Sequence, residues 1–188
     1  IGKVGQGMNF NGTGQYMSIL DPVSGVLDFG TGSFSVSVWG LHRDFTNPRT
    51  AFAFKKSNQC YLAGRPGWDI GHSFSVNGID VCLNDGVNMV RSAIALDVGS
   101  RPSDFINRWI HAVIVFDRSA GRTKYYINGV KQANEQNIST VTGSIDNAAG
   151  LYVGSLYGWN VDGILDEVRI YNRVLTAAEI TGLYNQGR

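Results

Sequence analysis

Short runs in which apolar and polar residues alternate recur along almost the whole chain. Just before Trp39, the residues Phe34, Val36 and Val38 alternate with serines, which is typical of a strand with one face in a core. Comparable runs predict further strands over residues 7–12, 16–19, 51–55, 59–63, 68–76, 78–83, 89–96, 123–127, 130–133 and 151–154. The chain is therefore predicted to consist mainly of β-strands.

Local signals predict how some of these strands connect. Asn128–Gly129 separates two strand runs, and this dipeptide favours a two-residue hairpin turn. The runs 7–12 and 16–19 flank a glycine-containing turn and are predicted to form a second hairpin. The run 109–117 is apolar on both faces, which indicates a central strand covered on two sides.

Only the end of the chain predicts a helix. Thr176 and Glu179 have the spacing of a capping box, and Leu175 with Ile180 matches a hydrophobic staple. Gly187 then supplies a stop signal. Many short strands followed by one short C-terminal helix predict an all-β fold, with two antiparallel sheets packed face to face as a sandwich.

Composition fits one such sandwich over residues 1–188. The chain has 24 glycines but only 4 prolines, which suits many strands joined by tight turns, and no repeat or linker divides it. The formal net charge is +1 with no long run of either sign, so strong attraction to nucleic acid or to an anionic membrane is not expected. No apolar run has the length of a membrane span, and the first residues do not form a signal peptide.

The run 162–171 places a carboxylate among aliphatic neighbours. Read with period two, Asp166 shares a face with Ile164, Val168 and Ile170. Burial of an unpaired carboxylate is costly, so Asp166 is expected to have a partner. That partner is either a hard metal ion or, near a strand end, backbone N–H groups or an arginine.

The two cysteines, Cys60 and Cys82, lie in neighbouring strand-like runs. They form no CxxC pair, and no histidine accompanies them at a zinc-binding spacing. They are either joined in a disulfide or buried as two free thiols, and the sequence leaves both alternatives open.

Four segments carry motifs in a recognisable order. They are Phe10-Asn-Gly12 with Tyr16, residues 29–39, residues 109–117 with 126–129, and residues 163–176. Together they resemble the laminin-G-like jelly rolls of the concanavalin A-like lectin/glucanase superfamily, whereas residues 42–100 match that pattern poorly. The resemblance implies a concanavalin A-like jelly roll from a secreted, multidomain protein.

The resemblance also implies a metal and a ligand. Members of this superfamily often bind carbohydrate on one sheet and hold a structural calcium ion elsewhere. The positions that match the family's calcium ligands are Asn11, Gly32 and Asp166. The expected Ca²⁺ would stabilise the fold and take no part in chemistry.

Catalysis is not expected from the acidic residues. Members that cleave glycans place paired carboxylates on one strand, because an acid and a nucleophile must flank the sugar bond. No such spacing occurs here, and Asp166 and Glu167 are predicted to point to opposite faces. His111 lies inside an apolar strand and is predicted to be a hydrogen-bonded core histidine.

Sugar recognition requires an aromatic face and polar groups for the hydroxyls. Two tryptophans outside the family framework, Trp68 and Trp159, are candidates, with Tyr157 beside Trp159 and with Arg65 and Asp69 near Trp68. Packing is the alternative role of both tryptophans.

These observations predict a non-catalytic, lectin-like carbohydrate-binding module. We expect it to be secreted, to bind a polysaccharide or oligosaccharide, and to adjoin other domains of a larger extracellular protein. Two alternatives remain for the same fold, a protein–protein adhesion module and a structural spacer.

Overall fold

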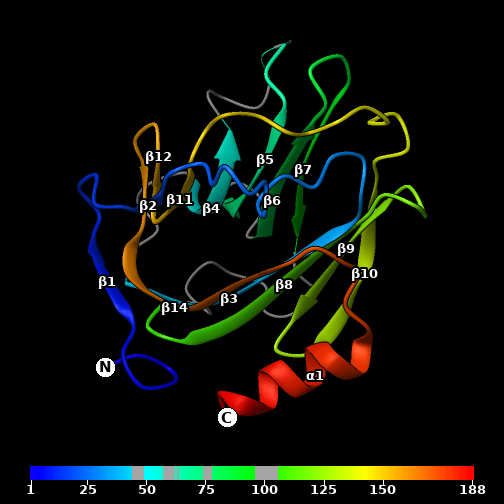
Figure 1. Cartoon of the computed structure of the whole chain (residues 1–188). Coiled ribbons are helices and arrows are strands. Elements are labelled where there is room, and N and C mark those ends of the chain that lie inside the picture. Colours follow the sequence, from blue (N-terminus) through cyan, green and yellow to red (C-terminus); the bar gives the residue numbers. More distant parts are fainter. Residues whose placement is uncertain (44–48, 57–61, 63, 74–77, 96–105) are drawn as a thin grey trace.

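The computed structural model describes residues 1–43, 49–56, 62, 64–73, 78–95 and 106–188. In this part of the chain, two six-stranded antiparallel sheets face each other, and one helix ends the chain (Figure 1). The prediction of an all-β sandwich with a short C-terminal helix is therefore confirmed. Residues 57–61 and 63 lie outside the described residues, as does nearly all of the strand predicted over 59–63.

Each sheet is assembled from strands that are distant in sequence. Sheet A has the spatial order β1 (Met8–Asn11), β14 (Asp162–Tyr171), β3 (Phe34–His42), β8 (Trp109–Asp117), β9 (Arg122–Ile127) and β10 (Val130–Asn137). Sheet B has the order β2 (Met17–Ile19), β11 (Leu151–Val153), β4 (Arg49–Lys56), β5 (Gly67–Ser73), β6 (Gly78–Asn84) and β7 (Met89–Ala95). A small hairpin pairs β12 (Ser155–Leu156) with β13 (Trp159–Asn160), and the helix is α1 (Ala177–Gln186).

The main core lies between the two sheets. Sheet A contributes Phe34, Val36 and Ile114, and sheet B contributes Ile70 and Val81, as the alternation of each strand predicts. A second apolar cluster lies on the other face of sheet A, where α1 packs through Ile180 (Figure 1). The central strand β8 is thus covered on both faces, as its sequence predicted.

Two turn and cap predictions are also confirmed. Asn128 and Gly129 both have positive φ and connect β9 to β10. The side chain of Thr176 accepts a hydrogen bond from the backbone N–H of Glu179, and the side chain of Glu179 accepts one from the backbone N–H of Thr176.

The strands β1 and β2 do not form the predicted hairpin. Met8 in β1 lies opposite Leu165 in sheet A, whereas Met17 in β2 lies opposite Val153 in sheet B. The glycine-containing segment between them crosses from one sheet to the other. The prediction was wrong because a turn signal shows that the chain reverses and does not show which strands pair afterwards.

A β-bulge changes the faces of β14. Its register with β3 shifts between Asp166 and Arg169, and Glu167 has a φ of 51°. The extra residue lets Leu165 and Ile170 both face the core, while Asp166 faces outward, opposite Trp39. The predicted common face of Asp166, Val168 and Ile170 is therefore wrong.

Candidate ligand-binding surface

Aromatic side chains gather on the outer face of sheet B, away from the core. Tyr152 in β11 lies opposite Phe54 in β4, and the two rings stack at 5.1 Å with an interplanar angle of 8°. Tyr16 leans against Tyr152 at 5.6 Å between ring centroids, and Trp159 packs on the same cluster. We call Tyr16, Tyr152, Tyr157 and Trp159 the aromatic surface; Phe54 lies beneath it.

The β12–β13 hairpin carries two of these side chains. Its turn residues, Tyr157 and Gly158, have φ values of 46° and 87°, which matches a tight type I′ turn. Tyr157 stands at the tip with 52% of its surface exposed. Partial burial raises the pKa of Tyr157, nearby Tyr152 adds to this effect, and the charge of Arg65 opposes it. The predicted ligand residues Tyr157, Trp159 and Arg65 are thus brought to one region.

An open pocket continues the aromatic surface at Tyr16. It encloses about 370 Å³ between the edge strands β1 and β2, and its lining includes Met8, Phe10, Tyr16 and Met17. Tyr16 is 57% exposed, so its ring faces both the pocket and Tyr152. The surface and the pocket together offer a continuous apolar strip with carboxamide groups at its margin.

Trp68 is not part of this surface. Its side chain points into the sandwich, is only 1% exposed and packs against Phe34 with ring centroids 5.5 Å apart. The prediction of Trp68 as a ligand-binding residue is corrected for this reason, because no ligand on the surface reaches its ring. Its position on the inner face of β5 follows from the alternation with Ile70.

Asp69 lies on the same face of sheet B as the aromatic surface, but its side chain is buried. It pairs in register with Phe54 and Cys82 on the outer face of sheet B, and only 1% of it is exposed. Asp80 lies diagonally across on β6 and forms an ion pair with Arg91 at 3.0 Å. The register thus brings two carboxylates to one face from neighbouring strands, which a search for acidic pairs on a single strand misses.

The residues predicted as calcium ligands do not form one site. Asn11 lies opposite Asp162, four residues along β14 from Asp166, and Gly32 precedes β3, whereas Asp166 lies opposite Trp39 near its other end. The oxygens of Asp166 accept hydrogen bonds from the backbone N–H groups of Val4 and Glu167, both at 2.8 Å. Asp166 therefore has the backbone partners of the alternative prediction, and calcium binding by this trio is corrected on geometric grounds.

Other potential metal ligands are also dispersed. Among the described residues, no group of three or more His, Cys, Asp or Glu side chains is arranged to hold a metal ion. The Oδ1 of Asn11 accepts hydrogen bonds from the backbone and hydroxyl of Thr13, and the N–H of Gly32 donates to Phe29 O at 2.7 Å.

The structure also bears on the predictions for the cysteines and for His111. Cys82 is buried and disulfide-bonded, and Cys60 lies outside the described residues. His111 is buried and its Nε2 lies 2.9 Å from Ser37 Oγ, as expected of a hydrogen-bonded core histidine. The sequence reasoning missed Tyr16 and Tyr152, although Tyr152 stands between two inward residues, which predicts that it points outward.

The sequence itself identifies the family. A family model described as the concanavalin A-like lectin/glucanases superfamily, Laminin_G_3, matches residues 11–181. The chain belongs to this superfamily. Among curated proteins, none matches the sequence significantly.

Solved structures with the same superfamily fold include toxin binding domains. The binding domain of Paraclostridial Mosquitocidal Protein 1 superposes with a TM-score of 0.70 at 18% identity, covering 98% of this chain and 44% of that one. The binding domain of botulinum neurotoxin serotype G gives a TM-score of 0.70 at 18% identity, with coverage of 94% and 41%. The binding domain of botulinum neurotoxin DC, in complex with rat synaptotagmin II, gives 0.67 at 18% identity, with coverage of 92% and 40%.

These similarities establish the fold of this superfamily member. The chain spans less than half the length of those binding domains. The helix in the described part of the chain, α1, is too short and too polar to cross a membrane.

Proposed function

We propose that this domain is a non-catalytic module that binds a polysaccharide or oligosaccharide through the aromatic surface of sheet B. The carrying observation is the exposure of Tyr16 and Tyr157 beside Tyr152 and Trp159 on one face. Aromatic rings with one free face stack on the C–H side of a sugar ring, and nearby polar groups bond its hydroxyls. Arg65 supplies a positive charge near Tyr157.

The acidic residues support a non-catalytic role. Asp69 and Asp80 lie on the same face as the aromatic surface, but each is 1% exposed and Asp80 is paired with Arg91. Glycoside hydrolysis requires two carboxylates that flank the sugar bond from both sides. The buried positions of Asp69 and Asp80 do not meet this requirement.

Secretion and a multidomain parent protein are parts of the same proposal. The disulfide at Cys82 supports an extracellular location, because disulfides persist in oxidising compartments. The similar solved domains are more than twice as long as this chain, which supports a setting beside further domains.

Affinity electrophoresis against a panel of soluble polysaccharides tests the binding proposal. The unmodified domain is expected to be retarded by at least one of them, and Tyr157→Ala or Trp159→Ala to weaken that binding by about tenfold or more. Trp109→Ala, which removes a partly exposed tryptophan from sheet A, serves as the control and should bind normally. Absence of retardation across the panel, or equal loss in the control, would reject the proposal.

A second function is favoured by a different surface. The end of β2 and the segment that follows it expose four aliphatic side chains, namely Ile19, Leu20, Val23 and Val26. Exposed apolar stretches of this kind mark protein interaction sites, so an adhesion module is the alternative. Loss of a protein partner in Leu20→Ser with Val23→Ser, while Trp159→Ala binds normally, would favour this alternative.

A further inference from the structure

A buried lysine stands at one end of the sandwich. Lys55 lies near the end of β4, and its side chain is only 2% exposed. In register it lies opposite Trp68 on β5 and Leu151 on β11, both of which belong to the core. A lysine on the inward face of a strand requires oxygen partners for its ammonium group.

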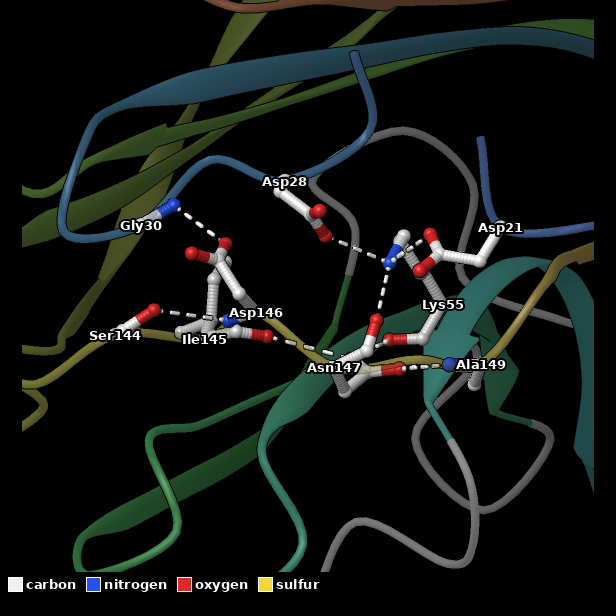
Figure 2. Close-up of polar contacts among 9 residues, drawn as sticks. All are labelled: Asp21, Asp28, Gly30, Lys55, Ser144, Ile145, Asp146, Asn147 and Ala149. Carbon is white, nitrogen blue, oxygen red and sulfur yellow. Dashed lines mark hydrogen bonds and ion pairs between the residues drawn. The ribbon is translucent and has the colours of Figure 1, made fainter. Parts of the chain in front are cut away.

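Three oxygens from two separate segments surround this ammonium group. Lys55 Nζ lies 2.8 Å from Asp21 Oδ1 and 2.9 Å from Asp28 Oδ1, and it donates to the backbone oxygen of Asn147 at 2.7 Å (Figure 2). Asp28 and Asn147 accept hydrogen bonds from the ammonium group, and Asp21 adds an ion pair. The segment before β3, the end of β4 and the segment before β11 are thus joined at one charge.

Hydrogen bonds hold Asn147, which supplies the backbone oxygen, in place. Asn147 Nδ2 donates back to the Lys55 backbone oxygen at 3.2 Å, and Asn147 Oδ1 accepts from Ala149 N at 2.9 Å (Figure 2). Asp146 Oδ1 accepts from Gly30 N at 2.6 Å, which ties the same two segments together a second time. The carbonyl oxygen at Lys55 therefore belongs to a hydrogen-bonded segment that is tied to the loop before β3.

A second cationic side chain, that of Arg118, binds backbone oxygens at the same end of the sandwich. The guanidinium of Arg118 donates to the backbone oxygens of Gly30, Val141 and Gly143 at 2.9, 2.8 and 2.6 Å. Carboxylates and backbone carbonyls are the ligands that calcium prefers, six to eight of them at 2.3–2.6 Å. Here such oxygens point instead at nitrogen donors, at distances typical of hydrogen bonds.

We propose that Lys55 is the built-in cation of this end of the sandwich and that the domain folds and keeps its stability without calcium. The positive charge that the superfamily resemblance assigned to a metal ion comes from the chain itself. Two observations carry the inference: the predicted calcium ligands Asn11, Gly32 and Asp166 lie apart, and Lys55 occupies a cage of two carboxylates and a carbonyl.

Thermal unfolding with and without a chelator tests the first half of the proposal. The melting temperature of the unmodified domain is expected to be the same within about 1 °C in EDTA and in millimolar CaCl₂. A calcium ion bound to the native state would make the melting temperature higher in CaCl₂ than in EDTA. Isothermal titration with CaCl₂ should give no heat of binding. A lower melting temperature in EDTA would overturn the proposal.

Substitution of Lys55 tests the second half. Lys55→Met keeps most of the unbranched stem but leaves Asp21 and Asp28 facing each other without a cation, so the melting temperature should fall by about 5–10 °C. Combining Lys55→Met with Asp21→Asn and Asp28→Asn removes that repulsion and should recover part of the loss. Lys131→Met, at an exposed ion pair, is the matched control and should change little.

The triple variant separates charge from packing. If Lys55 contributed only its aliphatic stem, the triple variant would be no more stable than Lys55→Met, and the proposal would fail. Recovery in the triple variant, together with the chelator result, supports the assignment of Lys55 as an internal cation.

Discussion

Three histidines are buried in their neutral form. Burial lowers the pKa of His42 to about 3, with a further contribution from His72, and lowers the pKa of His72 to about 4. Burial and the charge of Arg169 lower the pKa of His111 to about 4. In the unfolded chain each imidazole titrates near pH 6.5. Between these values the unfolded state binds more protons, so stability is lost as the pH falls below 6.5.

Acidification from pH 7 to pH 5 should therefore destabilise the domain. Each pH unit below 6.5 costs up to about 1.4 kcal/mol per histidine, or about 2 kcal/mol each at pH 5. Urea unfolding at pH 7, 6 and 5 measures this loss. His111→Gln should flatten the pH dependence by about a third, and a stability that does not change over this range would contradict the assignment.

Trp68 and Trp159 show how burial separates two similar residues. Trp68→Ala should lower the free energy of unfolding by about 3–5 kcal/mol, because it empties a large volume in the core. Trp159→Ala, on the outer face, should cost much less. Guanidinium unfolding followed by circular dichroism compares the two variants. Equal losses would show that Trp159 serves the packing of the fold.

At the scale of elements, the helix depends on its N-cap residue, Thr176. Thr176→Ala removes the side chain that caps the backbone N–H of Glu179 and should cost about 1 kcal/mol. The matched control is Thr181→Ala within the same helix, where the hydroxyl donates to Ala177 O and alanine is the better helix former. Chemical unfolding of both variants checks this, and an equal or larger loss at Thr181 would contradict it.

Elements whose signal is local were predictable from the sequence. The capping box at Thr176 and the turn at Asn128–Gly129 depend only on neighbouring residues, and both were predicted correctly. The pairing of β1 with β14 depends on residues more than 150 positions away, and the bulge at Glu167 depends on the register with β3. Local alternation contains neither kind of information.

The candidate site was predictable only in part for the same reason. Trp68 and Trp159 both follow turn residues outside the family framework, and only the placement of their strands decides that one is buried and the other partly exposed. Lys55 gave no reliable signal, because the register of β4 with β5 shifts between Ala51 and Ala53 and puts Ala51 on the outer face but Ala53 in the core. Its oxygen partners come from segments far away in the sequence, so the charge cage was not predictable.

At the scale of the whole molecule, β14 holds sheet A together. It lies between β1 and β3, so a strand from the C-terminal part of the chain joins two strands from the N-terminal part. Deletion of residues 162–188 should therefore abolish cooperative unfolding, because both neighbours lose their hydrogen-bonding partner. Deletion of residues 177–188 should retain a cooperative but weaker transition, since only the helix on the outer face is lost. Calorimetry distinguishes these outcomes, and a folded product of the longer deletion would disprove this role.

The antiparallel pairing of β1 with β14 determines how the domain responds to a pulling force. Met8 lies opposite Leu165 and Asn11 opposite Asp162, and the two termini emerge on the same side of the molecule (Figure 1). A tension applied through both termini separates the paired residues of β1 and β14 one pair after another. The separation begins at the hydrogen bond from Val4 N to Asp166. Strands loaded in this way yield at low force, so β1 would detach first while sheet B stays intact.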